Sequence, residues 1–257
     1  EAVTWTAGWY AVSGTVTIDQ PITVTGAVNL ILADGCTLNA EKGIVVTTDN
    51  SLTIYAQSGG TGTLNTTGTV DSDKNASAGI GGSTASLDSG AIIIHGGVIN
   101  ATGGSAASVG YGGAGIGGGT PNYGNGGSSG AITIYGGTVT ANSGAGSVTG
   151  AGIGGGGGIN GGTGSNIQIY GGTIKATGSS FGAGIGGGGS TSNPNSSYKS
   201  GDGAVTISGG TVTAVGGDYA AGIGGGGGYY YSTQYTSGGC TGGTGSVTIN
   251  GGIVDAS

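Results

Sequence analysis

The sequence predicts an all-β fold, a single-stranded parallel β-helix (β-solenoid) with three short strands per coil and glycine-rich corners. A repeat of 20–50 residues indicates a solenoid, a propeller or an array. The first observation is a strand–Gly-Gly–strand unit that occurs five times: AIIIHGGVINA from Ala91, AITIYGGTVTA from Ala131, IQIYGGTIKA from Ile167, AVTISGGTVTA from Ala204 and SVTINGGIVDA from Ser246. The second is the motif AGIGG, which begins at Ala78, Ala114, Ala151, Ala183 and Ala221.

Each strand of the repeated unit alternates apolar and polar residues. Ile132 and Ile134 face one way and Thr133 the other, and Val139 and Ala141 are expected to point inward. This period of two is typical of a strand with one buried face. The two glycines could form a hairpin turn or a sharp corner of a β-helix. The AGIGG motif favours the corner, because three short strands per repeat can stack in register as a three-sided solenoid, which we expect to be right-handed.

The chain is predicted to be one domain with an atypical start. Residues 1–50 contain both tryptophans and little Gly-Gly, and we expect an N-terminal cap from Trp5, Trp9 and Tyr10 followed by the first tight coils, since solenoid ends expose strand edges. Residues 51–257 form the glycine-rich coils of the same solenoid. The chain stops within a repeat, at GGIVDAS, so we expect flanking domains in a longer protein.

Long insertions follow the AGIGG motif and carry half of the twelve tyrosines. Repeat proteins place such insertions in loops on one face, often the binding face. Sugar rings stack on aromatic faces, and a tyrosine adds a hydroxyl for hydrogen bonding. The candidate ligand-binding residues are therefore Tyr229, Tyr230, Tyr231 and Tyr235, together with Tyr198, Tyr123 and Tyr111. The alternative is that these tyrosines pack over glycine-rich coils that lack side chains of their own.

Three other patterns suggest specific chemistry. Asp71, Asp73 and Asn75 resemble the opening of a calcium loop, but Ala76 stands where glycine is expected and the bidentate glutamate is missing. We expect no cofactor other than Ca²⁺ at this loop. Equivalent positions after the first strand predict a structural ladder, made of Tyr55, His95, Tyr135 and Tyr170 and followed by Ser208 and Asn250. Outward threonine rows suit an ice-binding face (Thr138, Thr173 and Thr211 beside Thr140 and Thr213), although Val98, Ile253, Asn100, Lys175 and Asp255 interrupt them.

Composition excludes several classes of function. The chain has only 4 basic side chains against 11 acidic ones, a net charge of −7, which argues against a basic patch for nucleic acid. No apolar run approaches the roughly 18–20 residues of a membrane helix, so no membrane insertion is expected. Glycoside hydrolysis needs two carboxylates about 5–10 Å apart, and no acid lies between Asp88 and Asp202. We therefore expect no enzyme.

The two cysteines, Cys36 and Cys240, lie near opposite ends of the predicted solenoid. A disulfide needs Cα atoms within about 7 Å, so both cysteines are expected to be free. The glycine-, serine- and threonine-rich β composition with few lysines is typical of secreted proteins.

Several segments together resemble a known kind of protein. WYAVSGTVTI, ITVTGAVNLILADGCTLNA, KGIVVTTDNSLTIYAQSGGTGTL and the repeated AGIGGG and ITIYGGTVTA resemble the glycine-rich β-solenoid repeat region of large adhesin-type surface proteins of gut Gram-positive bacteria. The resemblance implies an extracellular, cell-wall-attached module at the bacterial cell surface. Its expected partner is a glycan or a host surface glycoprotein. A non-binding stalk or spacer and an ice-binding protein remain as alternatives.

Overall fold

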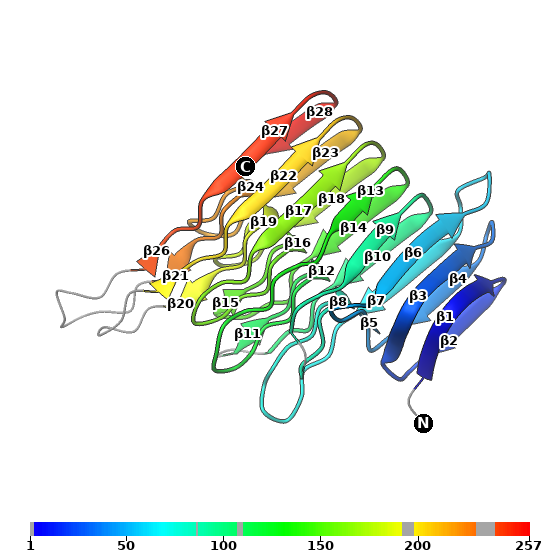
Figure 1. Ribbon diagram of the computed structural model, residues 1–257, viewed down its shortest axis with the longest axis horizontal. Coiled ribbons are helices and arrows are strands. Elements are labelled where there is room, and N and C mark those ends of the chain that lie inside the picture. The colour runs from blue at the N-terminus through cyan, green and yellow to red at the C-terminus, as the bar shows by residue number, and fades with distance from the viewer. Residues whose placement is uncertain (1–2, 86, 107–109, 192–197, 230–239) are drawn as a thin grey trace.

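The computed structural model describes residues 3–85, 87–106, 110–191, 198–229 and 240–257. Within them the chain winds into a parallel β-helix with three faces (Figure 1). The third face is an eight-stranded sheet and therefore marks eight coils: β2 (Thr15–Ile18), β4 (Thr37–Ala40), β7 (Thr63–Thr67), β10 (Val98–Thr102), β14 (Thr138–Asn142), β18 (Thr173–Thr177), β23 (Thr211–Val215) and β28 (Ile253–Ala256). The predicted fold class is confirmed.

The other two faces belong to one continuous sheet, because two long N-terminal strands serve both. β1 (Val3–Val12) pairs with β3 (Ile22–Leu32), whose start pairs with the first face and whose end pairs with the second. The first face holds β5 (Ile44–Val45), β8 (Ile80–Gly81), β12 (Ile116–Gly117), β16 (Ile153–Gly154), β19 (Ile185–Gly186) and β24 (Ile223–Gly224). The second holds β6 (Ser51–Ala56), β9 (Ala91–Ile94), β13 (Ile132–Ile134), β17 (Gly164–Ile169), β22 (Gly203–Ile207) and β27 (Gly245–Ile249).

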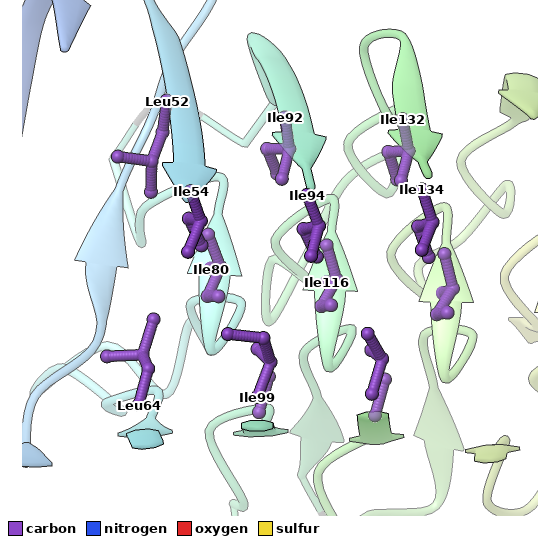
Figure 2. Close-up of a cluster of buried hydrophobic side chains, with 14 of the residues drawn as sticks. Leu52, Ile54, Leu64, Ile80, Ile92, Ile94, Ile99, Ile116, Ile132 and Ile134 are labelled. Carbon is purple, nitrogen blue, oxygen red and sulfur yellow. The ribbon is translucent and has the colours of Figure 1, made fainter. Parts of the chain in front are cut away.

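Residues at equivalent repeat positions stack into apolar columns inside the helix. Figure 2 shows Ile92 between Leu52 and Ile132, the partners that the parallel register gives it. Ile132, Ile134, Val139 and Ala141 are all fully buried, as the alternation predicts. Neighbouring coils thus supply each other's core, which is how solenoids achieve stability.

The Gly-Gly dipeptides are corners and not hairpin turns. The strands on either side of a dipeptide belong to different sheets, and each pairs in parallel with its counterparts in the next coils. The second glycine needs a positive φ, which is +91° at Gly137. A Cβ there would also lie only 2.6 Å from the carbonyl oxygen of Gly97 in the coil below, so glycine satisfies both the backbone angle and the close approach.

The first coil is closed by aromatic side chains. Trp5 is buried and stacks on Tyr10, with ring centroids 5.3 Å apart, and both face the core at positions paired with Val24 and Leu30. Trp9 behaves differently: its side chain is 65% exposed and stacks on Tyr55 at 5.3 Å. Both cysteines are free, as predicted, with Cys36 in the core and Cys240 half-buried.

Segments flanking the first face build a glycine-rich lobe along one side of the helix, opposite the Gly-Gly corners (lower left in Figure 1). Its strands are β11 (Tyr111–Gly112), β15 (Val148–Thr149), β20 (Ser190–Thr191), β21 (Tyr198–Lys199), β25 (Gly228–Tyr229) and β26 (Cys240–Thr241). Buried hydroxyls satisfy its backbone: Thr120 donates to the Gly112 carbonyl (2.8 Å) and accepts from the Gly157 N–H (2.8 Å). No helix among the described residues is long and apolar enough to span a membrane.

Candidate ligand-binding site

Two loops from successive coils meet in the lobe. The segment after β7 and the segment after β12 form an antiparallel bridge, in which Ala76 and Thr120 exchange backbone hydrogen bonds of 2.7 and 2.8 Å. One step along, the Asn122 N–H donates to the Asn75 side-chain oxygen at 2.9 Å. These contacts fix the two loops side by side although Asn75 and Asn122 are 47 residues apart.

An open hollow of about 550 Å³ lies at this junction, lined by Ser72, Asp73, Lys74, Asn75, Asn122 and Tyr123. Tyr123 is 84% exposed. The hollow therefore combines an accessible aromatic ring with a carboxylate, an ammonium group and two amides. Such a mixture suits a polyhydroxylated ligand, because the ring can stack on a sugar while the polar groups bond its hydroxyls.

Asp71 organises the loop beneath this hollow. Its Oδ1 accepts from the N–H groups of Asp73 and Asn75, and its Oδ2 accepts from the Asn75 side-chain amide, all at 2.9 Å. Partial burial opposes ionisation of the carboxyl, but hydrogen bonds from Asn75, Thr84 and Asp73 outweigh it and hold the pKa of Asp71 below its ordinary value. A carboxylate that accepts several hydrogen bonds is stabilised in its charged form.

The same contacts bear on the predicted calcium loop. Both Asp71 oxygens and the Asn75 amide oxygen are engaged in hydrogen bonds, whereas the Asp73 carboxylate accepts none within the described part of the chain. Among the described residues there is also no group of three His, Cys, Asp or Glu side chains that could hold a metal ion. Calcium binding by Asp71, Asp73 and Asn75 stays a prediction, and it would require these hydrogen bonds to rearrange.

Tyr111 lies near this site. Burial raises the pKa of its phenol, the nearby Tyr123 phenol raises it further, and a hydrogen bond with the Thr191 side chain acts in the opposite direction. Two of the tyrosines predicted to bind ligand, Tyr111 and Tyr123, therefore lie close enough to interact. The structure brings together loops that sequence reasoning had treated separately, those of Asp73 and Tyr123.

The remaining predicted tyrosines lie further along the lobe. Tyr198 is half-buried on β21, and its carbonyl accepts from the Thr241 hydroxyl of β26 at 3.3 Å. The backbone of Tyr229 pairs with Thr191 between β25 and β20. Tyr230, Tyr231 and Tyr235 lie outside the described residues.

The predicted ladder is present on the second face. Parallel rings join Tyr55 to His95 (4.7 Å between centroids), His95 to Tyr135 (4.8 Å) and Tyr135 to Tyr170 (5.1 Å), with interplanar angles of 5–9°. On the third face Thr138, Thr173 and Thr211 are adjacent in register, and Val98 and Ile253 flank them. The expected threonine row therefore spans three consecutive coils before an apolar residue interrupts it at each end.

The repeats match a known family of sequences. Residues 132–157, 167–189 and 205–227 match the model of the β-helix repeat family. The chain is similar to β-helix repeat proteins. Each matched segment runs from the second face through the Gly-Gly corner and the third face to the AGIGG strand of the next coil, so one match corresponds to one coil. Comparison with curated proteins and comparison with solved structures found no match.

Proposed function

We propose that this chain is an extracellular, adhesin-type β-solenoid module that binds carbohydrate or a host-surface glycoprotein through its lobe loops, without catalysis. The observation that carries the proposal is the hollow at Tyr123, where an 84% exposed ring stands beside Asp73, Lys74 and two asparagines. A tyrosine with so little of its surface buried gains little from packing, whereas a ring beside amides and a carboxylate matches the needs of sugar recognition.

Charge narrows the ligand class. The net charge of −7 disfavours polyanionic partners such as nucleic acid and heavily sulfated glycans. We therefore place neutral glycans first. The bacterial cell surface is the proposed location, on the strength of the composition and the resemblance of the repeats.

The test is a glycan and mucin array probed with wild-type protein and Tyr123→Ala. We expect selective binding that falls at least tenfold in the variant, equivalent to a loss of about 1.4 kcal/mol. Tyr219→Ala is the matched control, because Tyr219 is 88% exposed and lies against Phe181, with ring centroids 6.1 Å apart, in another loop. A variant with Tyr229, Tyr230, Tyr231 and Tyr235 changed to alanine tests the tyrosine loop separately.

A spacer that holds other domains away from the cell wall is the second candidate. It is favoured by the continuous parallel ladders that join all eight coils into one rod. A folded wild-type protein that binds nothing on the array would support the spacer and refute the binding module.

A further inference from the structure

The rings of the aromatic ladder stack on one another and are also partly exposed to solvent. It begins at Trp9, which stacks on Tyr55, and continues through His95 and Tyr135 to Tyr170. Trp9, Tyr135 and Tyr170 are 65%, 49% and 47% exposed. The four rings in register, from Tyr55 to Tyr170, have successive centroids 4.7, 4.8 and 5.1 Å apart, so their row extends for about 15 Å along the solenoid, and Trp9 adds a ring 5.3 Å from Tyr55. Contiguous exposed apolar surface of this kind marks an interaction site more often than scattered apolar residues do.

The spacing of the rings leaves part of each one accessible. Carbon atoms in van der Waals contact are about 3.5–4.0 Å apart, which is less than the centroid separations in the ladder. Nearly parallel rings at 4.7–5.1 Å are therefore offset, as aromatic pairs prefer. Tyr135 and Tyr170 are 49% and 47% exposed although they stack on each other, so part of each ring stays accessible to a ligand.

The residues beside the ladder favour a neutral ligand. The outward positions next to Tyr55, His95, Tyr135 and Tyr170 along their strands are Thr53, Ile93, Thr133 and Gln168. None of these is charged. The Tyr170 hydroxyl is held by Gln168, to which it donates at 2.8 Å, and Gln168 in turn donates to Asn166 at 2.8 Å. The row thus offers rings and neutral hydrogen-bonding groups without a carboxylate.

We propose that this ladder is a second carbohydrate-binding strip, which takes an extended, neutral, β-linked polysaccharide lying along the solenoid axis. A straight row on a rod matches a straight, flat glycan, whose apolar C–H faces can contact successive rings. The strip lies on the second face, whereas the hollow at Tyr123 lies in the lobe. The inference is therefore independent of the proposed function of the lobe.

The register of the ladder supplies a decisive variant. The N–H groups of Tyr135 and Tyr170 donate to the carbonyls of Ile94 and Ile134, both at 2.8 Å, and Ser208 donates to Ile169 in the same way at 2.7 Å. Ser208 therefore occupies the next rung of the ladder without a ring. Ser208→Tyr should extend the strip by one rung, and Thr213→Tyr places a new tyrosine on the third face as the matched control.

The experiment is titration calorimetry of the whole chain with cellohexaose and with cellobiose. We expect wild-type protein to bind cellohexaose, and the Tyr135→Thr/Tyr170→Thr double variant to lose at least tenfold in affinity. Ser208→Tyr should bind cellohexaose twofold to tenfold more tightly and leave cellobiose unchanged, while Thr213→Tyr should match wild type. Absence of cellohexaose binding by wild type, or Ser208→Tyr with wild-type affinity, would overturn the proposal. Ser208→Tyr is expected to increase the affinity for cellohexaose, so its result can be interpreted even if the double variant does not fold.

Discussion

The AGIGG strands make a sharp prediction about Gly154. Its backbone has a φ of +139°, and a Cβ at this position would lie 1.9 Å from the carbonyl oxygen of Gly186 in the next coil. That oxygen accepts the Gly155 N–H at 2.9 Å. An alanine side chain cannot be accommodated unless the two coils separate by about 1 Å, which would disrupt this hydrogen bond and strain the backbone.

The cost of Gly154→Ala has three parts. Overpacking costs about 1–3 kcal/mol, the backbone angle about 1–3 kcal/mol, and the weakened hydrogen bond about 0.5–1.5 kcal/mol. Together they amount to about 2.5–7.5 kcal/mol, a large share of the roughly 5–15 kcal/mol that stabilises a typical domain. We expect Gly154→Ala to shift the urea midpoint strongly downward, or to prevent folding, as measured by circular dichroism.

Gly242→Ala is the control for this prediction. A Cβ at Gly242 would be 3.8 Å from its nearest neighbour, the Gly226 carbonyl oxygen, an ordinary contact. The free energy of unfolding should stay the same or rise by about 0.4–1 kcal/mol, because alanine restricts the unfolded chain. If Gly154→Ala lowered the free energy of unfolding by less than about 1 kcal/mol, glycine would not be required there by coil spacing, contrary to our explanation of the motif.

Other predictions concern the core, the ladder, a carboxylate and the thiols. Ile134→Asp should abolish folding, because it places an unpaired charge in the fully buried column, whereas Ile134→Val should cost only about 0.5–1.5 kcal/mol; a folded aspartate variant in gel filtration and circular dichroism would contradict the inward assignment. His95→Ala removes two ring contacts, at 4.7 and 4.8 Å, and should cost about 1–3 kcal/mol, which His95→Tyr should restore; equal thermal melting of wild type and the alanine variant would show that the ladder adds no stability. Folding lowers the pKa of Asp71 from its ordinary value of 3.8. The ionised carboxylate therefore stabilises the folded state above pH 3.8, and this stabilisation is lost as the pH falls through the folded-state pKa. The free energy of unfolding should fall less steeply with acid in Asp71→Asn than in wild type, and identical pH profiles would show that Asp71 does not contribute. A reducing agent should leave the melting temperature unchanged, since Cys36 and Cys240 are free, and a fall on reduction would reveal a disulfide.

The repeated part of the fold could be predicted because one spacing is constant. Ile134 and Val139 are five residues apart, as are their counterparts in every repeat, so the strand–corner–strand unit always returns to the same register. Burial confirms both residues as core. The aromatic ladder could be predicted from the same register, because an outward-facing residue stacks on its counterpart in the next coil just as an inward-facing residue does.

The candidate site could be predicted only in part, because it forms where periodicity ends. Asp73 and Tyr123 were each singled out by residue type, but their loops differ in length and share no register. Their proximity depends on the bridge between Ala76 and Thr120, and no alternation in the sequence indicates it. The sequence also placed Trp9 in the N-terminal cap, whereas its side chain points outward and stacks on Tyr55. An aromatic residue near the end of a solenoid suggests a cap, but the sequence does not show which way its side chain points.

The two proposed binding surfaces differ in how they can change without loss of the fold. The hollow at Tyr123 depends on insertions on either side of the first face, and the length of these loops varies from coil to coil. The ladder depends on positions such as Ser208, which the corner and the columns hold in register whatever side chain is present. A change of ligand specificity is therefore expected in the loops, whereas a change in the length of the strip needs only a single substitution per coil. The two surfaces can accordingly be altered independently, which is why the variants at Tyr123 and Ser208 separate the two proposals.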